Sequence, residues 1–120
     1  MKHYTAEEAN ALLPYLAPTL VELREKFEEA ERIRTTVAQA AAGNGGSQKR
    51  EKWARTLARV QELMERLEEW EIVLRDFETG LVDFPSTMAG EEVYLCWRLG
   101  EPEVAHWHRP NEGFGGRHPL

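Results

Sequence analysis

The sequence has a single cysteine, Cys96, among its 120 residues, and no long run of apolar residues. One cysteine excludes an intramolecular disulfide framework, which favours a reducing compartment. No segment has the length and continuous hydrophobicity of a transmembrane helix or the pattern of a signal peptide. An excess of basic residues is also missing, since the net charge is −6. These absences argue against binding to nucleic acid or to a membrane, and they favour a cytoplasmic protein of bacterial type.

The composition is that of a folded protein. Hydrophobic residues make up 42% and charged residues 30% of the chain, so it can build a hydrophobic core and is not disordered. A length of 120 residues suits one domain, which we place over residues 1–120.

A first helical pattern begins near the N-terminus. Thr5 and Glu8 form a capping box, because the side chain of each can bond to the backbone N–H of the other. Pro14 is tolerated near the helix start, whereas Pro18 predicts a kink. The apolar residues that follow are spaced by alternating steps of three and four, which is a heptad signature. They are Leu13, Leu16, Leu20, Leu23, Phe27, Ala30 and Val37.

A glycine-rich turn near residues 43–47 separates this pattern from a second one with the same spacing. The second pattern comprises Trp53, Leu57, Val60, Leu63, Leu67, Trp70, Leu74 and Phe77. Gly80 stands where a helix C-cap glycine is expected. The two patterns predict a long, coiled-coil-like antiparallel helical hairpin over residues 5–79. Two helices alone leave part of each apolar stripe exposed, so we also expect a homo-oligomer, most simply a dimer.

Residues 80–120 have a different pattern and predict a small β unit with an irregular tail. Residues 92–99 and 103–108 alternate between polar and apolar side chains, as the two strands of a β-hairpin do. The sequence therefore predicts an α+β fold that is mostly helical. The apolar face of the hairpin is expected to pack at the base of the helices, near Leu13, Leu16, Leu74 and Phe77.

The register of the β-hairpin follows from its tryptophans. Pairing Leu95 with Trp107 keeps both on the apolar face, because directly opposed residues lie on the same side of a sheet. The same register places Cys96 opposite His106 and leaves residues 100–102 as the loop. On the polar face it gathers Tyr94, Cys96, Arg98, His106 and His108.

Thiolate and imidazole are suitable ligands for zinc and other transition metals such as iron or copper. The sequence thus predicts a metal site formed by Cys96, His106 and His108. Asp83 or His118 could supply a fourth ligand, or water could hold an open position. The simpler alternative is a metal-free polar face, in which the cysteine is a small buried hydrophobe and the histidines only pack beside the tryptophans.

A second chemistry needs no metal. Histidine changes its charge near neutrality, so His106 or His108 could act as an acid or base with Asp83 as the orienting carboxylate. Cys96 beside His106 could also be an activated thiolate. The residues available to contact an anion or a substrate are Tyr94, Arg98 and Arg117. Nothing in the sequence locates a substrate, so whether the protein is an enzyme stays open.

A non-enzymatic interaction or scaffold protein, acting through self-association of the helical hairpin, is the alternative to a metal-binding protein. In that case the β unit is only the base of the hairpin. Polar replacements at Leu57, Val60 or Leu67 would then change the oligomeric state. Replacement of Cys96 or His106 would have little effect.

Three regions carry distinctive segments. Residues 4–14 are Tyr-Thr-Ala-Glu-Glu-Ala-Asn-Ala-Leu-Leu-Pro, and residues 80–85 are Gly-Leu-Val-Asp-Phe-Pro. Near the end come Leu-Cys-Trp-Arg-Leu-Gly-Glu at 95–101, Trp-His at 107–108 and Gly-Phe at 113–114. Together they resemble an uncharacterised prokaryotic family catalogued as domain of unknown function 2203. The resemblance extends over the full length and implies a helical hairpin with a compact C-terminal unit, but it implies no activity.

Overall fold

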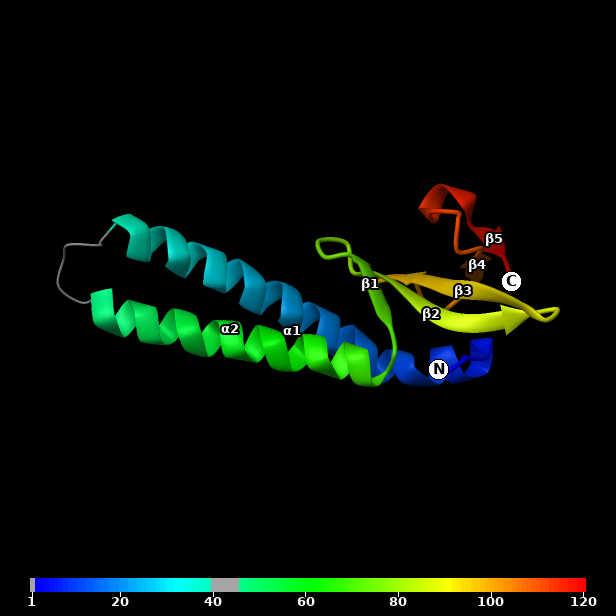
Figure 1. Cartoon of the computed structure of the whole chain (residues 1–120), viewed down its shortest axis with the longest axis horizontal. Coiled ribbons are helices and arrows are strands. Elements are labelled where there is room, and N and C mark those ends of the chain that lie inside the picture. Colours follow the sequence, from blue (N-terminus) through cyan, green and yellow to red (C-terminus); the bar gives the residue numbers. More distant parts are fainter. Residues whose placement is uncertain (1, 40–45) are drawn as a thin grey trace.

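Two long antiparallel helices followed by an antiparallel sheet make up the fold (Figure 1). The computed structural model describes residues 2–39 and 46–120. The helices are α1 (Ala6–Gln39) and α2 (Gly46–Glu69), and the sheet lies against the N-terminal part of α1. The molecule is elongated, with extents of 61 × 24 × 24 Å. This is the predicted α+β class, but about half of the chain is helical and not most of it.

The helical hairpin is present and its start is the predicted one. The N–H of Thr5 donates to the carboxylate of Glu8 (3.0 Å), and the N–H of Glu8 donates to the Thr5 hydroxyl (3.1 Å), which closes the capping box. Most of the predicted turn near 43–47 lies outside the described residues, and Gly46 is already part of α2. Within residues 2–39 and 46–120, neither helix has the length and apolar character needed to cross a membrane.

The second helix ends ten residues earlier than predicted. The N–H of Ile72 donates to the carbonyl of Leu67 (3.0 Å), and the N–H of Glu71 donates to that of Glu68 (2.9 Å). These bonds form a Schellman motif, whose left-handed residue is usually glycine. Here that residue is Glu71, with a φ of 56°. Because a glutamate occupies this position, the sequence carries no glycine signal for the end of α2.

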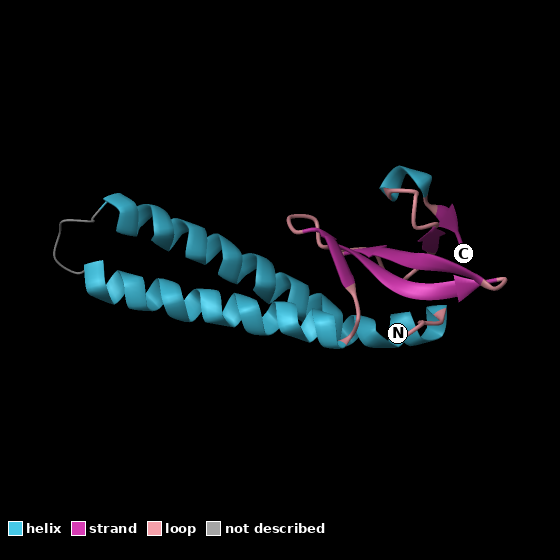
Figure 2. Ribbon diagram, in the orientation of Figure 1, coloured by secondary structure: helices cyan, strands magenta, loops and turns pink. Residues whose placement is uncertain are grey.

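Five strands form a meander in the order β1-β2-β3-β4-β5 (Figure 2). They are β1 (Val73–Asp76), β2 (Leu81–Met88), β3 (Glu91–Arg98), β4 (His106–His108) and β5 (His118–Pro119). The predicted helix over residues 70–79 is therefore wrong, since β1 lies there. Gly80 is not a helix cap but belongs to the β1–β2 turn, where its φ is 69°. The tail is more regular than predicted, because it contains a 3-10 helix, η1 (Phe114–Gly116), and the edge strand β5.

The predicted register between the third and fourth strands is confirmed. Leu95 pairs with Trp107, and Cys96 pairs with His106. The predicted loop over residues 100–102 is wrong, however, because the chain leaves the sheet after Arg98 and returns only at His106. Val104 instead turns into the core, and its N–H donates to the side-chain oxygen of Asn10 on α1 (2.7 Å).

The core lies between the sheet and the base of the helices, as predicted. One face of β2 and β3 contributes Val82, Phe84, Leu95 and Trp97, which are buried against Tyr4, Leu16 and other residues of the N-terminal segment. Leu13, Leu74 and Phe77 are partly buried against the same cluster. Since neighbouring residues of a strand point to opposite faces, Asp83 and Cys96 must lie on the other side of the sheet.

Candidate metal centre

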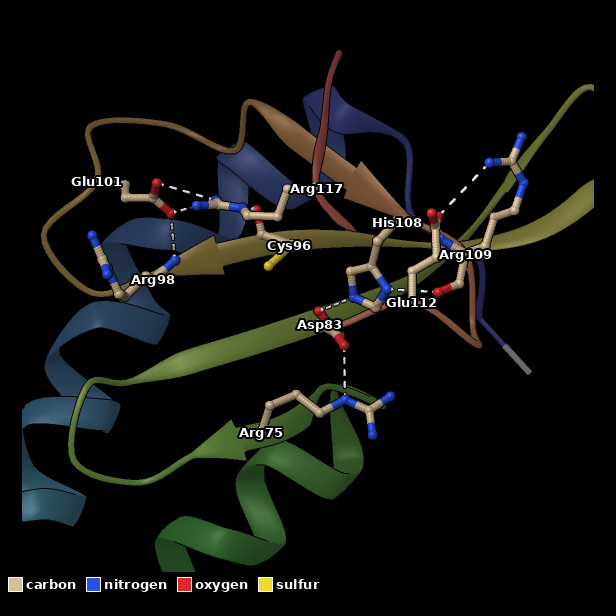
Figure 3. A network of polar contacts seen from close by, with 9 residues as sticks. All are labelled: Arg75, Asp83, Cys96, Arg98, Glu101, His108, Arg109, Glu112 and Arg117. Atoms are coloured by element: carbon tan, nitrogen blue, oxygen red, sulfur yellow. Dashed lines mark hydrogen bonds and ion pairs between the residues drawn. The ribbon is translucent and has the colours of Figure 1, made fainter. Parts of the chain in front are cut away.

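Three side chains from adjacent strands meet on the sheet face opposite the apolar core (Figure 3). Asp83 on β2 lies directly opposite Cys96 on β3, and β4 contributes His108. A carboxylate oxygen, a sulfur and an imidazole nitrogen all lie within 4.8 Å of one another. All three residues are buried, with exposed fractions of 1%, 1% and 5%. This group is able to hold a metal ion.

Both ring nitrogens of His108 have a defined partner. Nδ1 lies 2.8 Å from the carbonyl oxygen of Arg109, and Nε2 lies 2.9 Å from Oδ1 of Asp83. A carbonyl oxygen can only accept, so Nδ1 must carry the proton. In the neutral imidazole Nε2 then has a lone pair that faces an oxygen of Asp83. A proton shared between Nε2 and Oδ1, or a bound cation between them, satisfies both atoms.

Arg75 is the second partner of the Asp83 carboxylate. Its Nε donates to Oδ2 at 2.7 Å, and this hydrogen bond raises the pKa of Arg75, so that the guanidinium stays charged. Arg75 was not among the predicted site residues, because the apolar spacing predicts a helix at this position. The adjacent β-branched residues Ile72 and Val73 were the signal for a strand at this position.

In the metal-free protein, Cys96 keeps its proton to a higher pH than an ordinary thiol does. Burial, followed by the charge of Asp83, raises the pKa of this thiol from its ordinary 9.0 to about 11. The expectation of an activated thiolate next to His106 is therefore wrong for the metal-free protein. A bound metal would convert Cys96 to the thiolate, because a thiol that coordinates a metal loses its proton.

A partly enclosed cavity of about 200 Å³ adjoins the three side chains. Arg75 and the three clustered residues line one side of it. The tail forms the other side, through Pro110, Glu112, Gly113 and Phe114. Three protein ligands beside a cavity are the arrangement of a site that keeps one coordination position open.

His106 is not one of the three clustered residues, although it lies opposite Cys96. Its Nδ1 is buried and has no hydrogen-bond partner in the part of the chain that the structure describes. The sequence prediction of His106 as a metal ligand therefore finds no support in the geometry.

Arg117 lies near Cys96 but is paired elsewhere. Its Nη2 donates to both carboxylate oxygens of Glu101, at 2.8 and 3.1 Å, and lies 3.5 Å from the carbonyl oxygen of Cys96. Burial alone would raise the pKa of Glu101, but the hydrogen bonds from Arg117 and from the Arg98 backbone outweigh it and lower that pKa. Glu101 was not among the predicted site residues. Its carboxylate balances the charge of Arg117, which the sequence predicted to contact an anion.

The remaining predicted site residues surround the cluster without entering it. The ring of Tyr94 lies beside that of His108, with centroids 5.6 Å apart. The guanidinium of Arg98 lies over the ring of Phe114 at 5.4 Å. His118 stacks on Trp107, with ring centroids 4.6 Å apart, and its Nε2 lies 3.2 Å from the carboxylate of Glu112.

Comparison with known proteins identifies the family of the chain but no activity. No curated protein and no solved structure shows significant similarity to the chain. A family model matches residues 2–120, which confirms the full-length resemblance noted from the sequence. The chain belongs to the family described as uncharacterized conserved protein (DUF2203).

Proposed function

We propose that the protein binds a transition-metal ion through Asp83, Cys96 and His108. The observation that carries this proposal is the convergence of their ligand atoms within 4.8 Å in a buried site. A buried carboxylate needs positive partners, because an unpaired buried charge is strongly unfavourable. The orientation of His108 also fits, since a histidine that binds a metal commonly donates its other N–H to a backbone carbonyl.

Zinc is the first metal to test. It accepts thiolate, imidazole and carboxylate ligands, and three of them with one open position are typical of its catalytic sites. Two ligands of a tetrahedral zinc ion lie about 3.3 Å apart when each is about 2.0 Å from the metal. His108 Nε2 and Asp83 Oδ1 are 2.9 Å apart, so a small outward movement admits the ion. Iron and copper also bind thiolate and imidazole, so the metal must be identified by measurement.

Arg75 has a supporting role in this proposal. It donates to Oδ2 of Asp83, and Oδ1 of the same carboxylate faces His108. Residues that hydrogen-bond to a ligand fix its orientation and influence the affinity for the metal. Arg75 therefore orients Asp83 toward the other two ligands.

The proposal is tested by elemental analysis of untagged protein purified without chelator. We expect near-stoichiometric metal in the wild type and loss of metal in Asp83→Asn, Cys96→Ser and His108→Ala. His106→Ala is a matched control, because His106 lies on the same strand as His108 but outside the cluster. Metal-free wild type that also fails to bind added zinc, iron or copper would rule the proposal out.

A second candidate is self-association of the helical hairpin, most simply as a homodimer. The observation that favours it is the set of large apolar side chains exposed on α1 and α2. They are Tyr15, Phe27, Leu57 and Met64, with exposed fractions of 66%, 41%, 38% and 39%. Exposed apolar surface can mark a protein–protein contact, although single exposed residues are common.

Sedimentation of Leu57→Glu and Met64→Glu variants tests the second candidate. If the hairpin forms a dimer through this surface, the wild type is dimeric and the variants shift toward monomer while keeping their helix content. Leu67 is unsuitable for this test, because it is buried in the core and a charge there would unfold the protein. A wild type that sediments as a monomer at all concentrations would exclude self-association.

A further inference from the structure

We propose that the cavity beside the metal centre binds a small organic carboxylate, whose anionic group occupies the open coordination position. This inference rests on the proposed metal site. It concerns the space between the sheet, with Arg75 and the three ligands, and the tail from Pro110 to Phe114. Three observations support it, namely the charge of the site, the chemistry of its walls and the partners of the nearby charged residues.

The charge of the loaded site favours an anion. A divalent ion with the carboxylate of Asp83, the thiolate of Cys96 and a neutral His108 has no net charge. Arg75 lines the same cavity and adds one positive charge, because a guanidinium stays protonated in proteins. A monoanion in the open position makes the group neutral, whereas a neutral ligand leaves a positive charge in a partly enclosed site.

The walls of the cavity favour an organic anion over an inorganic one. Besides the polar residues, Leu81, Pro110 and Phe114 line it and supply apolar surface. The Phe114 ring is held in place by two guanidinium groups, that of Arg117 at 4.5 Å and that of Arg98 at 5.4 Å. A volume of about 200 Å³ accommodates several water molecules and hence a small carboxylate with a short apolar chain.

The other charged residues near the cavity are already paired. Glu112 also lines it, but its carboxylate accepts from the backbone N–H of Arg109 (2.9 Å) and lies 3.2 Å from Nε2 of His118. Its charge is met by the guanidinium of Arg109, whose Nη1 lies 3.7 Å from Oε1 of Glu112. Arg117 is bound to Glu101 and does not line the cavity. Arg75 lines it, and its Nε is bonded to Asp83, whose charge is already counted with the ion.

Full-length protein loaded with cobalt(II) provides the test. A thiolate-to-cobalt charge-transfer band reports whether Cys96 coordinates the ion, and the visible bands report changes at the open position. We expect both acetate and propionate to change the visible bands in a saturable manner. Propionate should bind about three- to fourfold more tightly, because one additional CH₂ group contacts the apolar wall.

The role of Arg75 is tested separately. Arg75→Gln should weaken acetate binding about tenfold, since it removes a charge close to the ligand position that solvent partly screens. Arg75→Lys keeps the charge and should retain most of the affinity. Arg24→Gln is the control, because it removes the same charge from α1 and neither lines the cavity nor contacts its walls. If the two glutamine variants weaken acetate equally, Arg75 has no specific role and the charge argument fails.

The outcomes separate this inference from the metal proposal. If no charge-transfer band forms with cobalt(II), the metal site itself is refuted. If the band forms but acetate and propionate leave the visible spectrum unchanged, the metal site stands and the anion site is wrong. If chloride binds as tightly as propionate, the cavity does not select an organic anion, and the inference is also overturned.

Discussion

His108 and Asp83 are in direct contact although their strands do not pair with each other. Nε2 of His108 lies 2.9 Å from Oδ1 of Asp83. The strand between them, β3, carries Cys96, so the three side chains come from three successive strands of the sheet. An ion at this point would connect β2, β3 and β4, and its binding energy would add to the stability of the sheet.

We therefore predict that metal raises the melting temperature. At a free metal concentration one hundred times Kd, binding adds about 2.7 kcal/mol to the free energy of unfolding. For a domain of this size that corresponds to an increase in Tm of about 10 °C. Thermal unfolding followed by circular dichroism, with and without a chelator, measures this difference.

The Asp83→Asn variant serves as the control for the metal effect. It removes the charge of one ligand, so its Tm should be the same with zinc and with chelator. His106→Ala should keep the full metal-dependent increase. An equal increase in Asp83→Asn and in the wild type would mean that zinc stabilises the protein from another site.

The protonated state of Cys96 gives a second prediction, for the metal-free protein. Its pKa is 9.0 in an ordinary environment and about 11 in the folded state. The folded state thus holds this proton over a range of pH in which the unfolded state has lost it, and stability falls as pH rises from 9 to 11. Two units of pKa correspond to roughly 2–3 kcal/mol. Urea unfolding at several pH values measures the loss, and Cys96→Ala should show a clearly smaller decline.

Thiol alkylation checks the same property independently. Below pH 9 the buried thiol of Cys96 should react with iodoacetamide far more slowly than a free cysteine does, because the thiolate is the reactive species. Fast modification at neutral pH in the folded, metal-free protein would contradict the raised pKa.

The sequence predicted the part of the site that depends on strand periodicity. The pairing of Leu95 with Trp107 and of Cys96 with His106 followed from keeping both tryptophans on one face, and the structure has this register. Strand periodicity did not predict which side chains of this face meet in the cluster. The twist and the side-chain directions bring Asp83 and His108 together and leave His106 aside, and period two alone carries no such information.

The end of α2 was mispredicted for a physical reason. The apolar steps continue through Leu74 and Phe77. These residues are partly buried against the core, as residues of a helical stripe would be, but they lie on a strand and a turn. The helix ends because Glu71 adopts a left-handed conformation that its side chain does not favour. A carboxylate oxygen of Glu71 accepts from the backbone N–H of Lys2 (2.8 Å), a contact between distant segments that local sequence patterns do not show.

Gly80 gives a third prediction, because two constraints act on it at once. Its φ is 69°, and a Cβ atom at this position would lie 2.7 Å from Cβ of Leu99. Gly90 has a φ of 81° but no neighbouring atom within 4 Å of such a Cβ. Gly80→Ala should therefore destabilise the protein by about 2–4 kcal/mol, and Gly90→Ala by only about 1 kcal/mol. Denaturant unfolding compares the two variants, and equal losses would show that the contact with Leu99 is relieved at no cost.

The partly buried ion pair of Glu101 and Arg117 gives the last prediction. The hydrogen bonds of Glu101 outweigh its burial and hold its pKa below the usual range. A carboxyl whose pKa is lower in the folded state stabilises the protein above its unfolded pKa of about 4.3, and this contribution is lost as pH falls through the folded value. Glu101→Gln should thus destabilise the protein by about 2–3 kcal/mol at pH 7, because Arg117 loses its counter-charge.

The pH dependence distinguishes this pair from a general loss of packing. The difference in unfolding free energy between wild type and Glu101→Gln should shrink as pH falls below about 4, where protonation removes the same charge in the wild type. Glu92→Gln is the control, because Glu92 is exposed and should change stability little at any pH. A difference that stays constant down to low pH would mean that the amide disturbs the site sterically and that the charge of Glu101 contributes nothing.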